Sequence, residues 1–131
     1  MNADEAARWL AYARSDLDAA SALLHDPNHY PRQVCFLAQQ SAEKSLKAIL
    51  VCIEIEFPFT HDLDRLRDLI PMGWRVKTEC PDLASLTAWA IESRYPSDMP
   101  DVLTADAVQA VELAEQVYRA TARDLDRYIK T

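Results

Sequence analysis

Residues 34–53, VCFLAQQSAEKSLKAILVCI, are the segment around which the chain is organised. At the α-helical spacing of about 100° per residue, its apolar side chains share one broad face and a polar stripe lies opposite. The small side chains of Ser41, Ser45 and Ala48 border the apolar face, so a neighbouring helix can approach closely. This pattern predicts a central helix that faces the core. The apolar face comprises Val34, Ala38, Ala42, Leu46, Ile49 and Ile53, and the opposite edge carries Phe36, Gln40, Glu43, Lys44 and Lys47.

Two further long helices are predicted, over residues 3–24 and 104–129, because apolar residues recur there every three or four positions. Asn2 or Asp4 can cap the first of them, and Thr104 can cap the last. Proline-containing breaks separate the helices. Short connections between long helices favour antiparallel neighbours, as in up-and-down bundles.

The middle of the chain is predicted to hold two shorter helices. One covers residues 61–70 with Thr60 as its N-cap, and the other follows Pro81 and ends near Glu92. Residues 74–80 have no clear period and are predicted to be a connector. The chain is therefore expected to be one all-α domain, residues 1–131, with an antiparallel up-and-down four-helix bundle and a short additional helix.

The composition narrows the class of protein. The chain has 131 residues, one glycine and a net charge of −7. A single glycine argues against β-hairpins and phosphate-binding glycine loops, and the acidic charge argues against nonspecific binding to DNA or RNA. Cys35, Cys52 and Cys80 show no CxxC spacing and are expected to be buried, reduced thiols. With no signal peptide and no apolar run of about 18 residues, we expect a soluble cytoplasmic protein without a membrane segment.

A scattered set of polar residues is the candidate ligand site. The three histidines do not have metal-ligand spacing, so neither a metal site nor another cofactor is expected. Cationic side chains suit an anionic ligand, and an arginine can bind phosphate in bidentate fashion. Two structural alternatives stay open: Glu43 and Lys47 can form an exposed i,i+4 pair, and His61 can be a structural residue near a helix start. The proposed ligand-binding residues are Lys44, Lys47, His61 and Arg94, supported by Gln40, Glu43, Asp62 and Tyr95.

Four motifs in order resemble the HEPN family, the higher eukaryotes and prokaryotes nucleotide-binding domain. They are an early helix of pattern WL.YA..DL.AA..LL from Trp9 to Leu24, then CFLAQQSAEKSLKAIL (35–50), THDL (60–63) and RYP (94–96). The resemblance implies an antiparallel four-helix bundle with a short extra helix, usually dimeric. Prokaryotic members are often encoded beside a small nucleotidyltransferase, with which they behave as toxin–antitoxin-like pairs. Many members are metal-independent ribonucleases, and others resemble nucleotide-binding modules.

One departure from the family pattern concerns catalysis. The ribonuclease members carry an arginine followed, after four to six residues, by a histidine, and no histidine follows Arg94 in that window. The catalytic residues are therefore unknown. The leading hypothesis is a homodimeric nucleotide- or RNA-phosphate-binding module that pairs with a nucleotidyltransferase. The alternatives are a metal-independent endoribonuclease in which His61 replaces the missing histidine, and a structural interaction protein without a ligand.

Overall fold

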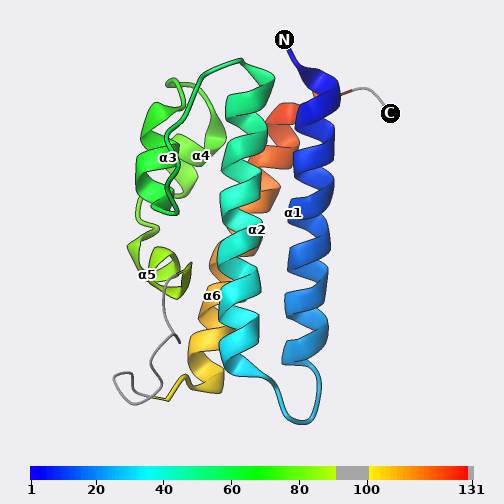
Figure 1. Ribbon diagram of the computed structural model, residues 1–131, viewed down its shortest axis with the longest axis vertical. Coiled ribbons are helices and arrows are strands. Elements are labelled where there is room, and N and C mark those ends of the chain that lie inside the picture. Colours follow the sequence, from blue (N-terminus) through cyan, green and yellow to red (C-terminus); the bar gives the residue numbers. More distant parts are fainter. Residues whose placement is uncertain (91–100, 130–131) are drawn as a thin grey trace.

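The computed structural model describes residues 1–90 and 101–129, and these residues form helices without any strand (Figure 1). Three helices of 22 residues each dominate the molecule. The long helices are α1 (Ala3–Leu24), α2 (Pro31–Cys52) and α6 (Thr104–Leu125). The short ones are α3 (Leu63–Leu69), α4 (Arg75–Glu79), α5 (Ala84–Thr87) and a 3₁₀ turn, η1 (Ala88–Ala90).

The helices form an antiparallel bundle, as the sequence predicts. In Figure 1, α1 runs down from the N-terminus, α2 returns upward beside it, and α6 also runs upward. The short helices α3, α4 and α5 occupy the side of α2 and α6 away from α1, where they replace a fourth long helix. Pro71, Gly73 and Pro81 interrupt that segment, because proline lacks the backbone donor that a continuous helix requires and Gly73 adopts φ of 103°.

Helix α2 is the centre of the core. Its apolar face is buried against α1 and α6, as the sequence predicts, and Leu46 and Ile49 are fully buried. The small residues on its border permit a close approach to α1, since Ser41 Oγ donates a hydrogen bond of 2.7 Å to the Ala13 carbonyl oxygen. The three cysteines are buried and form no disulfide. Burial, with a smaller contribution from Glu79, raises the pKa of the Cys80 thiol to about 11, which keeps it unreactive.

Two predicted N-caps, Thr60 and Thr104, were wrong by two residues and by one residue. The N-cap of α3 is Asp62, whose carboxylate accepts from the Arg65 amide at 3.3 Å, while Thr60 Oγ1 accepts from the Asp62 amide. Helix α6 begins at Thr104, which is its first helical residue, and it ends at Leu125. Asp106 in its first turn accepts from the Leu103 amide at 2.9 Å. Asp62 thus takes the capping role expected of Thr60, whereas the N-cap of α6 is Leu103, whose side chain cannot accept a hydrogen bond.

Residues 74–80 were predicted to be a connector, and that prediction was wrong, because they contain α4. The Asp124 carboxylate on α6 accepts from the Arg75 amide at 2.6 Å and from Arg75 Nε at 3.0 Å. Next to this contact, the rings of Trp74 and Tyr128 stack with centroids 5.7 Å apart. Contacts with α6 therefore stabilise a helix too short to be stable alone.

The predicted helix after Pro81 corresponds to α5 and η1, which extend to Ala90. Its expected last residues, near Glu92, lie outside the described residues. Within the described part of the chain, no helix is both long and apolar enough to cross a bilayer.

Candidate functional site

A buried carboxylate, that of Glu43 on α2, is the centre of the candidate site. Its Oε1 accepts hydrogen bonds from His61 Nδ1 at 2.7 Å and from Gln39 Nε2 at 3.1 Å. Its Oε2 accepts from Lys47 Nζ at 2.9 Å. The side chains of Glu43 and Lys47 are only 7% and 12% exposed. The alternative that these residues form an exposed surface pair was therefore wrong.

The surroundings of Glu43 favour its ionised form. Burial alone raises the pKa of the carboxyl group, but the hydrogen bonds from His61, Lys47 and Gln39 outweigh burial, so the pKa lies below its ordinary value. Lys47 is itself enclosed, with Nζ 5.8 Å from the centroid of the Trp9 ring and 5.6 Å from that of Phe57. Glu43 and Lys47 thus form a fixed, nearly water-free ion pair.

The lowered pKa of Glu43 predicts a loss of stability in acid. The unfolded chain, in which a glutamate has a pKa of about 4.3, binds this proton more readily than the folded chain. The contribution of Glu43 is thus fully present above that pH and decreases as the pH falls through the lower folded pKa. Urea unfolding between neutral pH and about pH 3 should show this loss. Glu43→Gln should lack this part of the pH dependence, and an unchanged slope would contradict the assignment.

His61 lies at the edge of the buried cluster, and its ring is half-exposed. An ionised carboxylate can only accept hydrogen bonds, so Nδ1 must carry the proton that binds Glu43. Nε2 then carries the lone pair of the neutral ring. Among residues 1–90 and 101–129, no hydrogen-bond partner contacts Nε2. The buried carboxylate therefore fixes the tautomer of an accessible histidine, the same relation that orients the base in many hydrolytic sites.

The other predicted site residues have different surroundings. Lys44 Nζ pairs with Asp16 of α1 at 2.5 Å, so this lysine ties α1 to α2 and does not contact Glu43. Gln40 joins the cluster indirectly, because its amide donates to Gln39 Oε1 at 2.7 Å. Asp62 is the cap of α3. Arg94 and Tyr95 lie outside the described residues. The structure thus brings together Glu43, Lys47 and His61 of the predicted set, with Gln40 one contact away.

Sequence reasoning missed the side chains that complete this cluster. Gln39 is fully buried and also donates to the His61 carbonyl oxygen at 3.3 Å, which ties the loop to α2. Trp9 and Phe57 enclose Lys47. Their aromatic character was visible in the sequence, but nothing in its spacing indicated that α1 and the loop after α2 meet at one lysine.

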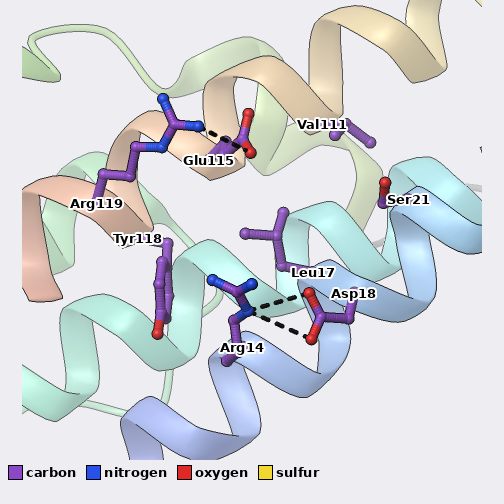
Figure 2. A pocket seen from close by; sticks show the side chains of 8 residues that line it. All are labelled: Arg14, Leu17, Asp18, Ser21, Val111, Glu115, Tyr118 and Arg119. Carbon is purple, nitrogen blue, oxygen red and sulfur yellow. Dashed lines mark hydrogen bonds and ion pairs between the residues drawn. The ribbon is translucent and has the colours of Figure 1, made fainter.

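A second candidate site is a pocket of about 280 Å³ between α1 and α6 (Figure 2). Arg14 pairs with Asp18 of α1 at 3.0 Å, and Arg119 pairs with Glu115 of α6 at 3.3 Å. The guanidinium of Arg14 also lies 5.6 Å from the centroid of the Tyr118 ring. Each arginine that lines the pocket is paired with an acid on its own helix, so neither guanidinium offers an unpaired charge to an anion.

The chain is a helical bundle in which a glutamate of the central helix α2 accepts a hydrogen bond from a histidine of the following loop. The HEPN domain family model matches residues 6–125, and the chain therefore belongs to the HEPN family. No curated protein matches the sequence.

Two solved structures are similar to the chain. TT1696 from Thermus thermophilus is 25% identical, with 94% of this chain and 98% of that chain covered and a TM-score of 0.79. ST0689, an archaeal HEPN homologue, is 22% identical, with 92% and 97% covered and a TM-score of 0.66. The second likeness concerns the fold alone.

Proposed function

We propose that this HEPN protein is a nucleotide- or RNA-phosphate-binding module and that His61 is its first contact with the ligand. The observation that carries the proposal is the hydrogen bond from His61 Nδ1 to the buried Glu43, which leaves Nε2 of this half-exposed ring without a hydrogen-bond partner among the described residues. A neutral Nε2 accepts a hydrogen bond from a ribose hydroxyl, and a protonated ring donates to a phosphate oxygen. Both groups occur together in nucleotides.

Lys44 and Lys47 have a limited role in ligand binding, because both of their charges already have partners. Lys44 and Lys47 are already paired with Asp16 and Glu43, so neither offers a free charge without breaking a contact. We propose that Lys47 holds the Glu43 carboxylate in place and that Lys44, which pairs with Asp16, contributes less to ligand binding. Arg94 is the cation that we propose to bind the phosphate, because it lies in the RYP motif (94–96), which resembles the arginine-containing motif of the family.

Calorimetric titration with nucleoside monophosphates and a short single-stranded RNA tests this proposal. We expect measurable binding by the wild type. Arg94→Lys keeps the charge but loses bidentate geometry, so it should weaken binding by about tenfold with little change in melting temperature. Absence of binding for every nucleotide and RNA would remove the ligand role. A lower melting temperature in Arg94→Lys would instead indicate a structural arginine.

We also propose that the protein is a homodimer that pairs with a small nucleotidyltransferase in a toxin–antitoxin-like system. Exposed apolar side chains, among them Tyr12, Phe36 and Met72, provide surface for such contacts. Light scattering over a dilution series should give twice the chain mass of 14.9 kDa at micromolar concentrations. A mass that stays at one chain throughout the series would contradict the dimer.

A second candidate function is a metal-independent endoribonuclease. The specific observation in its favour is that the Glu43–His61 pair has the arrangement of a general base with its orienting carboxylate. The missing Arg–His motif argues against it, and we expect little or no cleavage of RNA by the purified protein. Cleavage in the presence of EDTA that His61→Ala abolishes, with folding intact, would establish the second function.

A further inference from the structure

Phe59 stands in the loop that leads from α2 to His61, and its ring is exposed to an unusual degree. The side chain is 93% exposed, whereas Phe57, two residues earlier, is packed over the Lys47 ammonium group. The ring of Phe59 contacts only the ring of His61 among the described aromatic residues, with centroids 5.6 Å apart and an interplanar angle of 68°. Pro58 between the two phenylalanines restricts the backbone. An aromatic surface is therefore presented beside the accessible histidine.

The charge around this loop limits how an anion can be held there. Glu54, Glu56 and Asp62 are exposed acids close to Phe59 and His61 in the chain. The negative charges of these carboxylates repel a phosphate group, so phosphate contacts alone do not favour binding of a nucleotide at this surface. Stacking on an aromatic ring requires no charge and accepts any base, since every base has a π face. Recognition at this loop thus needs the uncharged contribution that Phe59 can provide.

We propose that Phe59 is a stacking platform for a nucleobase and that His61 Nε2 contacts the sugar or phosphate of the same nucleotide. The ligand class is then a nucleotide with an unpaired base, as in single-stranded RNA, and neither free phosphate nor duplex RNA. Bases in a duplex are stacked on their neighbours and do not offer a face to a protein side chain. This inference rests on the proposed function and specifies its ligand.

Binding measurements with Phe59 variants test the inference. The probes are a short single-stranded RNA, the same sequence as a duplex, and ribose 5-phosphate, which lacks a base. Phe59→Leu should weaken binding of the single strand by about tenfold, and Phe59→Trp should retain it. Ribose 5-phosphate should bind at least tenfold more weakly than the single strand to the wild type. Val108→Ala, at an exposed apolar side chain on α6, is the control and should stay within about twofold of wild type. Circular dichroism should show intact helices, because both side chains are exposed.

The outcomes separate this inference from the proposed function. Binding of the single strand that is unchanged in Phe59→Leu, or duplex binding as tight as that of the single strand, would overturn the stacking role while leaving a ligand site at His61. If the wild type binds none of the probes, the proposed function fails, and the inference fails with it. Loss of affinity for the single strand in Phe59→Leu, together with weaker binding of ribose 5-phosphate than of the single strand by the wild type, would support both.

Discussion

Replacing Glu43 with leucine is expected to lower the free energy of unfolding by about 3–5 kcal/mol. The substitution removes the acceptor for three donors at once: Lys47, Gln39 and His61. Lys47 is then a nearly buried ammonium group without its counter-ion, and the fully buried Gln39 amide loses one partner. Urea unfolding at neutral pH, monitored by circular dichroism, measures the change.

Two matched variants separate the charge of Glu43 from its shape. Glu43→Gln keeps the size and one acceptor oxygen, so we expect a smaller loss, about 1–3 kcal/mol. Glu115→Gln removes one partner of the exposed Glu115–Arg119 pair, and its effect should be below about 1 kcal/mol. A loss under about 1 kcal/mol in Glu43→Leu would show that the cluster does not hold the loop against α2.

A pair of His61 variants should separate binding from stability. The asparagine amide nitrogen takes approximately the place of Nδ1, so His61→Asn can still donate to Glu43 but lacks any group at Nε2. The glutamine amide reaches approximately the place of Nε2 and gives up the contact with Glu43. We therefore expect His61→Asn to keep stability within about 1 kcal/mol of wild type and to weaken nucleotide binding by tenfold or more, about 1.4 kcal/mol.

His61→Gln should show the opposite pattern. Loss of the hydrogen bond to a buried carboxylate should cost about 1–2 kcal/mol of stability, whereas part of the ligand affinity should remain. Calorimetric titration and urea unfolding on the same preparations provide both values. If His61→Asn binds as tightly as wild type, the contact at Nε2 is refuted, and the role of His61 is to fix the loop that carries it.

The fold could be predicted from the sequence because its main signal is local. The apolar residues of α1, α2 and α6 recur at helical spacing, and the small residues around Ser41 indicate a close helix contact. The segment between α2 and α6 was less predictable. Helix α4 depends on Asp124, which is distant in sequence, and propensity contains no information about such a partner.

The candidate site was only partly predictable for a similar reason. Glu43, Lys47 and His61 were selected as a polar group, and the structure joins them. The spacing of Glu43 and Lys47 suggests an exposed pair, because helical periodicity places them opposite the apolar face. The loop after α2 buries both side chains, because Phe57 covers Lys47 and His61 covers Glu43. No pattern within α2 could indicate that a loop folds back over its polar stripe.

The most direct test of the Glu43–His61 site is the ¹⁵N spectrum of the histidine rings during titration with a single-stranded RNA. The rings of His25 and His29, whose Nδ1 atoms contact the backbone carbonyl oxygens of Ser21 and Leu24, are internal controls in the same sample. The predicted result is a His61 ring protonated at Nδ1 in the free protein, with an Nε2 signal that shifts on addition of RNA while those of His25 and His29 do not. A His61 ring protonated at Nε2 but not at Nδ1, or an Nε2 signal unaffected by RNA that binds, would contradict the proposed site.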